Sequence, residues 1–236
     1  HPNSIMATLP KENLSKALPS QIAAFESSNS FFPMYGVINR PIPADGQTTI
    51  SILPDTDLNE MLTCHDPEPV DGPMMVLRSR EKASDGAPVH TVTALEVAFP
   101  ETTQKWFETK LKRRPPEYYQ YKQMRCDSVA HRMRAHIEPC NDMRVIDTAS
   151  SLTYRDYLHS PDGSAYGIQQ KMGQFSVMGR LPLANIYACG QSAMVPGVLG
   201  AMMSALFVCR SLLGRETFAE YLASKDPAAL RAGIDA

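Results

Sequence analysis

The chain has 236 residues, of which 43% are hydrophobic and 20% charged, and its formal net charge is -2 at pH 7. This composition is typical of a globular protein that can bury a core, as one large domain or two small ones. The balanced charge excludes a strongly basic surface, so we expect no nucleic-acid partner. The 5 cysteines include no C-x-x-C pair, which indicates neither a disulfide framework nor a zinc knuckle and favours reduced thiols.

The first ten residues, HPNSIMATLP, have no initiator methionine and none of the basic and apolar regions of a signal peptide. The longest apolar stretch, residues 193–209, is interrupted by proline, glycine and serine. It is shorter than the ~20 apolar residues of a membrane span. We therefore expect a cytoplasmic protein, with peripheral contact to a membrane as the alternative.

The N-terminal half predicts two short helices followed by strands. Residues 2–25 carry two helical patterns, which Pro10 and Pro19 are expected to break. Four segments then predict strands because they are rich in branched and aromatic residues: SFFPMYGVINRPI, TTISILP, PMMVLRSR and HTVTALEVAF. Pro33, in the first of them, indicates an edge strand or a bulge. The acidic segment 55–72 predicts a surface connection.

Helical periodicity begins in the middle of the chain. PETTQKWFETKLKRR predicts one helix and PEYYQYKQMRCDSVAHRMRAHI a second, with Pro115 and Pro116 between them. MRVIDTASSLTYRDYL predicts extended structure, HSPDGSAYG a turn-rich loop and LANIYACG a short strand. A long apolar helix follows, and RETFAEYLASKD predicts an outer helix.

A turn with three spaced glycines precedes the long apolar helix, in YACGQSAMVPGVLGAMMSALFVCRSLLG. Gly190, Gly197 and Gly200 permit unusual backbone angles and let another group lie against the main chain. Amides at a helix start favour a polar or partly negative atom there. Close packing of helices explains the glycines equally well. No two of the 13 glycines are separated by one residue, so the G-x-G-x-x-G dinucleotide fingerprint is absent.

The other candidate motifs have ordinary explanations. The 6 histidines are scattered, and His131 and His136 are not four residues apart, so we expect no metal site. The basic run KLKRR, residues 110–114, predicts a solvated helix end, with contact to an anionic membrane surface as the alternative. The 13 methionines, which include Met202 and Met203 beside the glycine turn, could line an apolar pocket, and core positions are favoured for most of them.

The segment NIYACGQSAMVPGVLGAMMSALFVCRSLL resembles the C-terminal flavin-contacting segment of the phytoene desaturase, carotenoid isomerase and all-trans-retinol saturase group of FAD-dependent oxidoreductases. SLTYRDYLHSPDGSAYG resembles the group's threonine-bearing strand and G-x-x-Y-G loop, and KWFETKLKRRPPEYYQYKQ its substrate-domain helices. HPNSIMATLP resembles the end of a flavin-domain strand and the helix after it. The resemblance covers nearly the whole chain, and it is strong in the last third and loose elsewhere.

This resemblance implies an α/β fold of the α+β kind, with a mixed-sheet substrate-binding domain and the C-terminal part of a FAD-binding Rossmann-like domain. It assigns residues 1–13 to the end of the first FAD-domain part, 14–142 to the substrate-binding domain and 143–236 to the C-terminal FAD-domain segment. The expected partner is the N-terminal FAD-binding half, from the same polypeptide or a second chain. Without that half we expect an inactive chain, and a homodimer is left open.

The resemblance also implies which residues meet the cofactor. The expected cofactor-binding residues are Gly190, Gln191, Ser192, Gly197, Val198, Leu199 and Gly200. The first two would end the last strand against the ribityl chain, and the last four would bring helix amides to the pyrimidine edge of the flavin. Ser192 stands where the group usually has an acidic residue, so its bond to the ribityl hydroxyls is expected to be weaker.

The implied function is a flavin-dependent oxidoreductase that saturates, desaturates or isomerises carbon–carbon bonds of an apolar polyene, isoprenoid or other lipid-like substrate. FAD is the expected cofactor, and NAD(P) is a candidate electron donor. The flavin carries the hydride chemistry, so we expect no identifiable catalytic side chain. Tyr166 is the candidate for the substrate pocket, against an ordinary buried aromatic. The alternatives are a non-catalytic lipid- or protein-binding module and an amine-oxidase-type flavoenzyme.

Overall fold

The computed structural model describes residues 1–10, 12, 14–41, 49–54, 56, 57, 59, 72–174, 177, 179–181, 183 and 185–224. The predicted acidic connection, 55–72, lies almost wholly outside them. The chain divides into two compact units. Unit 1 consists of His1–Ser27 and Tyr166–Ala236, and unit 2 is Ser28–Ala165.

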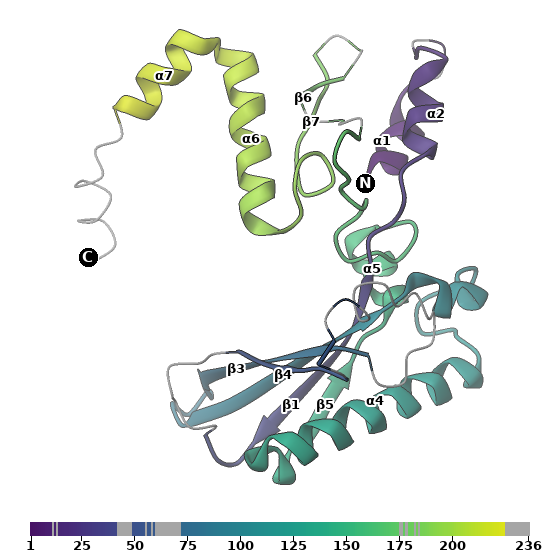
Figure 1. Ribbon diagram of the computed structural model, residues 1–236, viewed down its shortest axis with the longest axis vertical. Helices are drawn as coiled ribbons and strands as arrows, with labels where there is room; N and C mark the ends of the chain where they lie inside the picture. The colour runs from purple at the N-terminus through teal and green to yellow at the C-terminus, as the bar shows by residue number, and fades with distance from the viewer. Residues whose placement is uncertain are drawn as a thin grey trace. The chain divides into compact units, whose positions relative to one another are not determined.

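Unit 2 is built on a five-stranded antiparallel sheet with strand order β2-β3-β4-β1-β5 (Figure 1). The strands are β1 (Ser30–Ile38), β2 (Thr49–Ile52), β3 (Met74–Lys82), β4 (Pro88–Ala98) and β5 (Arg144–Thr148). The four strands predicted from the N-terminal half are confirmed as β1 to β4. With the helices of both units, the sheet confirms the α+β class.

Pro33 lies in a strand that is paired on both sides, so its expected place in an edge strand is wrong. The ladder between β1 and β5 begins with Met34 opposite Thr148. Ala149, just past the end of β5, donates its N–H to the Pro33 carbonyl at 2.9 Å. Proline has no N–H for the reciprocal bond, and because that bond would lie beyond the end of β5, its absence leaves the ladder intact. The predicted bulge occurs nearby, where the register shifts between Tyr35 and Gly36.

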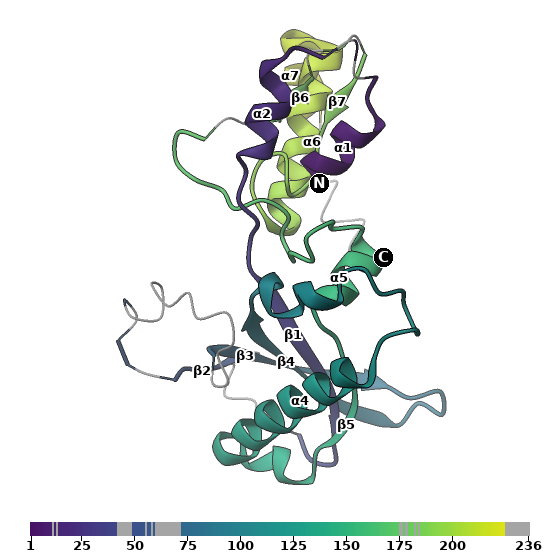
Figure 2. The same ribbon diagram turned by 90° about the vertical axis from the view of Figure 1, so that its right-hand side faces the viewer.

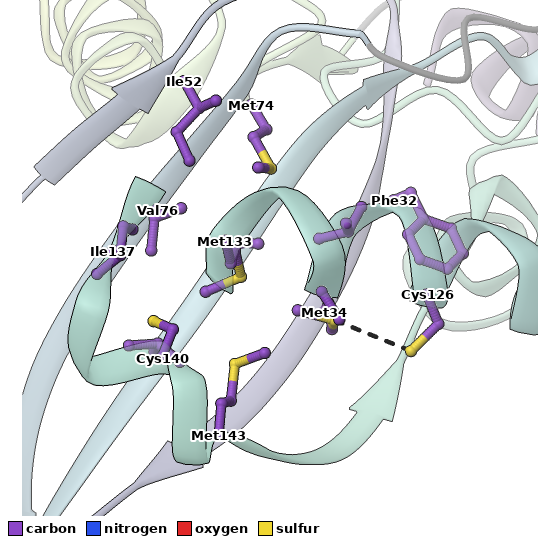
Figure 3. Close-up of a cluster of buried hydrophobic side chains, with 14 of the residues drawn as sticks. Phe32, Met34, Ile52, Met74, Val76, Cys126, Met133, Ile137, Cys140 and Met143 are labelled. Carbon is purple, nitrogen blue, oxygen red and sulfur yellow. Dashed lines mark hydrogen bonds between the residues drawn. The ribbon is translucent and has the colours of Figure 1, made fainter. Parts of the chain in front are cut away.

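Helix α4 (Pro116–His136) covers one face of this sheet and confirms the second predicted helix (Figures 1 and 2). Alternate residues of β1 point to it, and Phe32 and Met34 are fully buried there (Figure 3). Met133 of α4 packs among them, and Cys126 of the same helix lies 3.9 Å from Met34 between the two sulfur atoms.

Two segments of unit 2 differ from their predictions. The helix expected over 100–114 is only a 3-10 helix, η2 (Pro100–Trp106), followed by turns. The segment expected to stay extended after β5 forms α5 (Ser151–Leu158), because Ser150 and Thr153 make a capping box at its start. A second 3-10 helix, η3 (Glu138–Asp142), leads into β5.

Unit 1 has a smaller core. Its elements are α1 (Pro2–Thr8), α2 (Ala17–Ala23), β6 (Gly179–Arg180), β7 (Tyr187–Ala188), α6 (Gly197–Leu213) and α7 (Arg215–Ala223). The predicted short strand, long apolar helix and outer helix correspond to β7, α6 and α7. Pro19 lies in the first turn of α2 and does not break it, since a proline there removes no intrahelical bond.

The borders of the units differ from the domain borders that the resemblance implied after residues 13 and 142. Leu18 and Ile22 of α2 share a core with Leu9, which places α2 in unit 1. The pairing of β5 with β1 keeps β5 in unit 2. The assignment of the units to a flavin domain and a substrate domain stays a prediction.

Candidate functional site

Two glycines, one in the turn before α6 and one at its first residue, leave the main chain open to approach. Gly190 has a φ of 107° and Gly197 a φ of 87°. A Cβ built on either would meet no atom of the described residues within 4 Å. Since such angles strain an L side chain, glycine is favoured at both positions by the backbone, and the space beside them is open.

Gly200 serves the packing of the turn. A Cβ at this position would lie 1.8 Å from the carbonyl oxygen of Val195, so any larger residue would push the turn off the helix. The sequence left close packing and ligand approach equally open for the three glycines. The structure gives packing at Gly200 and open approach at the other two.

Ser204 ties the turn to the helix. The N–H of Gly190 donates to the Ser204 hydroxyl at 2.7 Å, and that hydroxyl donates to the Ala201 carbonyl at 2.6 Å. Ser204 is completely buried. Sequence analysis did not select this residue, although a serine one helical turn after Gly200, on the same side of an apolar helix, was a usable signal.

The start of α6 is polar in its backbone and apolar in its side chains. Its N-cap residue, Pro196, makes no side-chain capping bond. The side chains of Val198 and Leu199 are 79% and 74% exposed. The first amides of the helix therefore carry the positive end of its dipole with apolar groups beside them, while Gln191 is half-buried in the turn.

The hydroxyl of Ser192 faces another part of unit 1. Its Oγ lies 1.9 Å from the position that a Cβ of Gly167 would take. This contact places the loop that contains Tyr166 beside the glycine turn. Tyr166 itself is 40% exposed, which differs from an ordinary buried aromatic.

One side of α6 forms an exposed apolar surface, which we call the α6 face. Its members are Val195, Val198, Leu199, Met202, Met203, Leu206, Leu212 and Leu213. Met202 and Met203 are 63% and 38% exposed, so these two are not among the methionines that the core holds. Contiguous apolar surface of this kind marks a binding or interaction site.

The sheet of unit 2 carries a second apolar surface, on the side opposite α4, which we call the open sheet face. Its cross-strand rows place Tyr35 opposite Thr93, and Leu95 opposite Met75. Tyr35 is 43% and Met75 38% exposed. The face therefore combines apolar side chains with hydroxyl groups, among them those of Tyr35 and Thr93.

A charged cluster that sequence analysis missed lies in the core beneath α4. Glu96 of β4 is completely buried and forms ion pairs with Arg125 and Arg132 of α4. Burial raises the pKa of Glu96 to about 7, and the two arginines oppose that rise. The signal was present, since Glu96 shares one face of its strand with the apolar residues Val92 and Ala94, and the arginines are seven residues apart on one helix face. The cluster lies on the covered side of the sheet, so we assign it to the core.

Neither a metal-ligand cluster nor a helix able to cross a membrane occurs among the described residues. They contain no group of three or more side chains that could hold a metal ion. Within the same part of the chain, no helix combines the length and the hydropathy that crossing a bilayer requires.

Comparison with known proteins points first to a class, the oxidoreductases. The similar proteins are all-trans-retinol 13,14-reductases. That of Danio rerio is 26% identical over 137 residues, 55% of this chain and 23% of the relative. That of Macaca fascicularis is 28% identical over 129 residues, which are 49% of this chain and 21% of the relative. That of Homo sapiens is 26% identical over 132 residues, which are 50% of this chain and 21% of the relative.

The similarity is partial, because the chain spans less than a quarter of the length of these relatives. No protein-family profile matches the chain. No solved structure matches it. The comparisons thus support a likeness to retinol saturase-like oxidoreductases.

Proposed function

We propose that the chain is part of a flavin-dependent oxidoreductase that acts on carbon–carbon bonds of an apolar polyene, isoprenoid or other lipid-like substrate. The observation that carries this proposal is the similarity to three enzymes named for reducing the 13,14 bond of all-trans-retinol. Saturation of a retinoid-like polyene is the favoured reaction.

The open sheet face supports an extended hydrocarbon as substrate. Met75 and Leu95 lie opposite each other on neighbouring strands, and such a row can lie against a rigid chain of carbon atoms. Tyr35 and Thr93, one row along, offer hydroxyl groups to a polar end such as an alcohol. Burial of the hydrocarbon would contribute roughly 25 cal/mol for each Å² of apolar surface removed from water.

FAD is the cofactor that we propose, bound at the start of α6. Gly190 and Gly197 fit such a group because their main chain is open, and the amides of Val198 and Leu199 fit the flavin edge where negative charge arrives on reduction. Ser192 fits less well, because its hydroxyl faces Gly167. We therefore expect backbone contacts to dominate. The bound flavin would supply the hydride chemistry, with NAD(P) as a candidate electron donor.

We propose that a nucleotide-binding portion of polypeptide packs on the α6 face and covers it. The relatives are more than four times as long as the part that matches, so they contain chain enough for such a portion. The same polypeptide or a second chain could supply it. A homodimer joined through the α6 face is the alternative cover.

The test is co-expression of this chain with a G-x-G-x-x-G-bearing portion encoded beside it, followed by a flavin absorption spectrum of the complex. Val198→Asp should lower the flavin content per complex at least about tenfold, since a carboxylate would face the electron-rich edge of the ring. Leu222→Asp, in α7 outside the α6 face and 49% exposed, is the matched control and should keep the flavin. A correctly assembled, colourless wild-type complex would contradict the proposal.

A non-catalytic lipid-binding module is the second candidate. It is favoured by Ser192, which replaces the expected acidic residue and directs its hydroxyl to Gly167. A colourless complex that still extracts retinol from vesicles would support this candidate. Turnover of retinol by a flavin-containing complex would exclude it.

A further inference from the structure

The basic run at residues 110–114 forms an exposed turn in unit 2, not the predicted helix end. The N–H of Arg113 donates to the Lys110 carbonyl at 3.0 Å, and Lys112 has a φ of 61°. Lys110, Lys112 and Arg113 are exposed, and Leu111 at the tip is 44% exposed. Among the residues described, none forms an ion pair with these three cations.

Two arginines anchor both ends of this turn to α5. Before the turn, Arg155 donates from Nη2 to the Thr109 carbonyl at 2.8 Å. After the turn, Arg114 forms a buried ion pair with Asp156. The anchors hold the turn in a fixed shape, including the left-handed backbone at Lys112, which is unfavourable for a lysine.

Exposed aromatic and aliphatic side chains lie next to the anchors. Tyr119 is 50% exposed, and its ring centroid lies 5.4 Å from that of Tyr118, which accepts a bond from Arg114. Tyr157 and Leu158, directly after Asp156, are 64% and 57% exposed. Cations, an apolar tip and exposed rings therefore lie close together around the two anchors.

We propose that this surface, the basic turn surface (Lys110–Arg113 with Tyr119, Tyr157 and Leu158), docks on an anionic lipid bilayer. The three cations complement lipid headgroups, and each should raise the partition coefficient about fivefold. Leu111 enters the interface, and the tyrosines lie at the level of the headgroups, where amphipathic rings are favoured. An acidic protein would use the cations but would leave the apolar tip without a role.

The experiment measures co-sedimentation of the full chain with vesicles of phosphatidylcholine, alone or mixed with phosphatidylserine. Binding through the apolar α6 face would occur with both lipids, so the difference between them reports the cations. K110Q/K112Q should lower binding to the anionic vesicles about 25-fold. R80Q/K82Q removes the same charge from exposed positions of β3 and should change binding by less than about twofold.

Two further variants protect the test against misfolding and separate charge from insertion. Lys112→Gly keeps the turn, since glycine accepts its φ of 61°, and should lower binding about fivefold. Leu111→Ser keeps all charges and should weaken binding severalfold even where salt is high. The proposal is overturned by equal wild-type binding to both vesicle types, or by equal losses in K110Q/K112Q and R80Q/K82Q. Tighter binding to a polyglutamate peptide than to anionic vesicles would assign the surface to an acidic protein instead.

Discussion

A single hydroxyl group restricts residue 167 to glycine. The Oγ of Ser192 lies 1.9 Å from the place that a Cβ would occupy, and the φ of Gly167 is +75°. Two penalties would therefore act on a larger residue, one from the backbone angle and one from the clash. This close contact fixes the loop that contains Tyr166 against the glycine turn.

Gly167→Ala should lower the free energy of unfolding of unit 1 by about 2–4 kcal/mol, as the sum of the two penalties. Gly173→Ala is the matched control, because Gly173 has nearly the same φ of +74° and no atom of the part of the chain that the structure describes lies within 4 Å of its Cβ position. The control should cost only the backbone part, about 1 kcal/mol. Urea unfolding measures both. If adding Ser192→Ala restores none of the difference, the clash is not its cause.

Glu96 should make the stability of unit 2 depend on pH. Its pKa in the folded chain, about 7, exceeds its ordinary value of 4.5, because burial disfavours the carboxylate. The folded state therefore holds this proton more tightly than the unfolded state does. The stabilisation is complete below pH 4.5 and is lost as the pH rises to about 7, by on the order of 3 kcal/mol.

Glu96→Gln removes the titrating group, and the histidines, common to both proteins, cancel in the comparison. Urea unfolding of both proteins from pH 5 to pH 8 should show the wild type losing stability relative to the variant as the pH rises. A difference that stays constant over this range would show that Arg125 and Arg132 keep the carboxylate ionised throughout.

At the scale of elements, Ser204 decides how the glycine turn is held on α6. Ser204→Ala would remove the acceptor of the Gly190 N–H, which is bonded at 2.7 Å. The exchange of that amide hydrogen, followed by NMR, should accelerate about fivefold, since its opening no longer breaks one hydrogen bond of about 1 kcal/mol. Ser211→Ala is the control: Ser211 donates to the Phe207 carbonyl in the same helix without contacting the turn. Equal acceleration of the Gly190 amide exchange in both variants would contradict the role of Ser204 in holding the turn on α6.

Several of the elements that could be predicted carry a long local pattern, although short ones such as β2 and β7 were predicted too. Strands β1 and β4 alternate over nine and eleven residues, and α4 repeats over 21. Helix α5, with eight residues, is too short for its periodicity to stand out, although Ser150 with Thr153 was a usable cap signal. The expected helix over 100–114 became η2 and a turn, because Arg155 and Arg114 hold the carbonyls and charges of that segment to α5.

The candidate site likewise has one part that the local sequence predicts and another part that it does not. The open main chain at Gly190 and Gly197 follows from local sequence, since glycine is the residue that tolerates these angles. The contacts of Ser192 with Gly167, and of Ser204 with Gly190, join residues 25 and 14 positions apart and depend on packing that no local pattern encodes. The same holds for Glu96 and its two arginines.

At the scale of the whole molecule, each unit has its own core. The core of unit 2 joins four strands, α4 and η3, and includes Met133, which is completely buried. The core of unit 1 joins short segments from both ends of the chain around Ile22, which is 3% exposed. Separate cores of different size should unfold in separate transitions, with unit 1 first.

The two transitions can be assigned with the chain's 1 tryptophan, Trp106, which packs against Tyr118 in unit 2. Tryptophan fluorescence should therefore follow only the later transition on heating, while far-UV circular dichroism follows both. Met133→Ala and Ile22→Ala each remove a buried side chain, at a cost of about 2–5 kcal/mol. Met133→Ala should lower the fluorescence midpoint by more than about 5 °C, whereas Ile22→Ala should lower only the early dichroism transition. A fluorescence midpoint that falls equally in both variants would mean that the two cores unfold together, and the division into two cooperative units would be wrong.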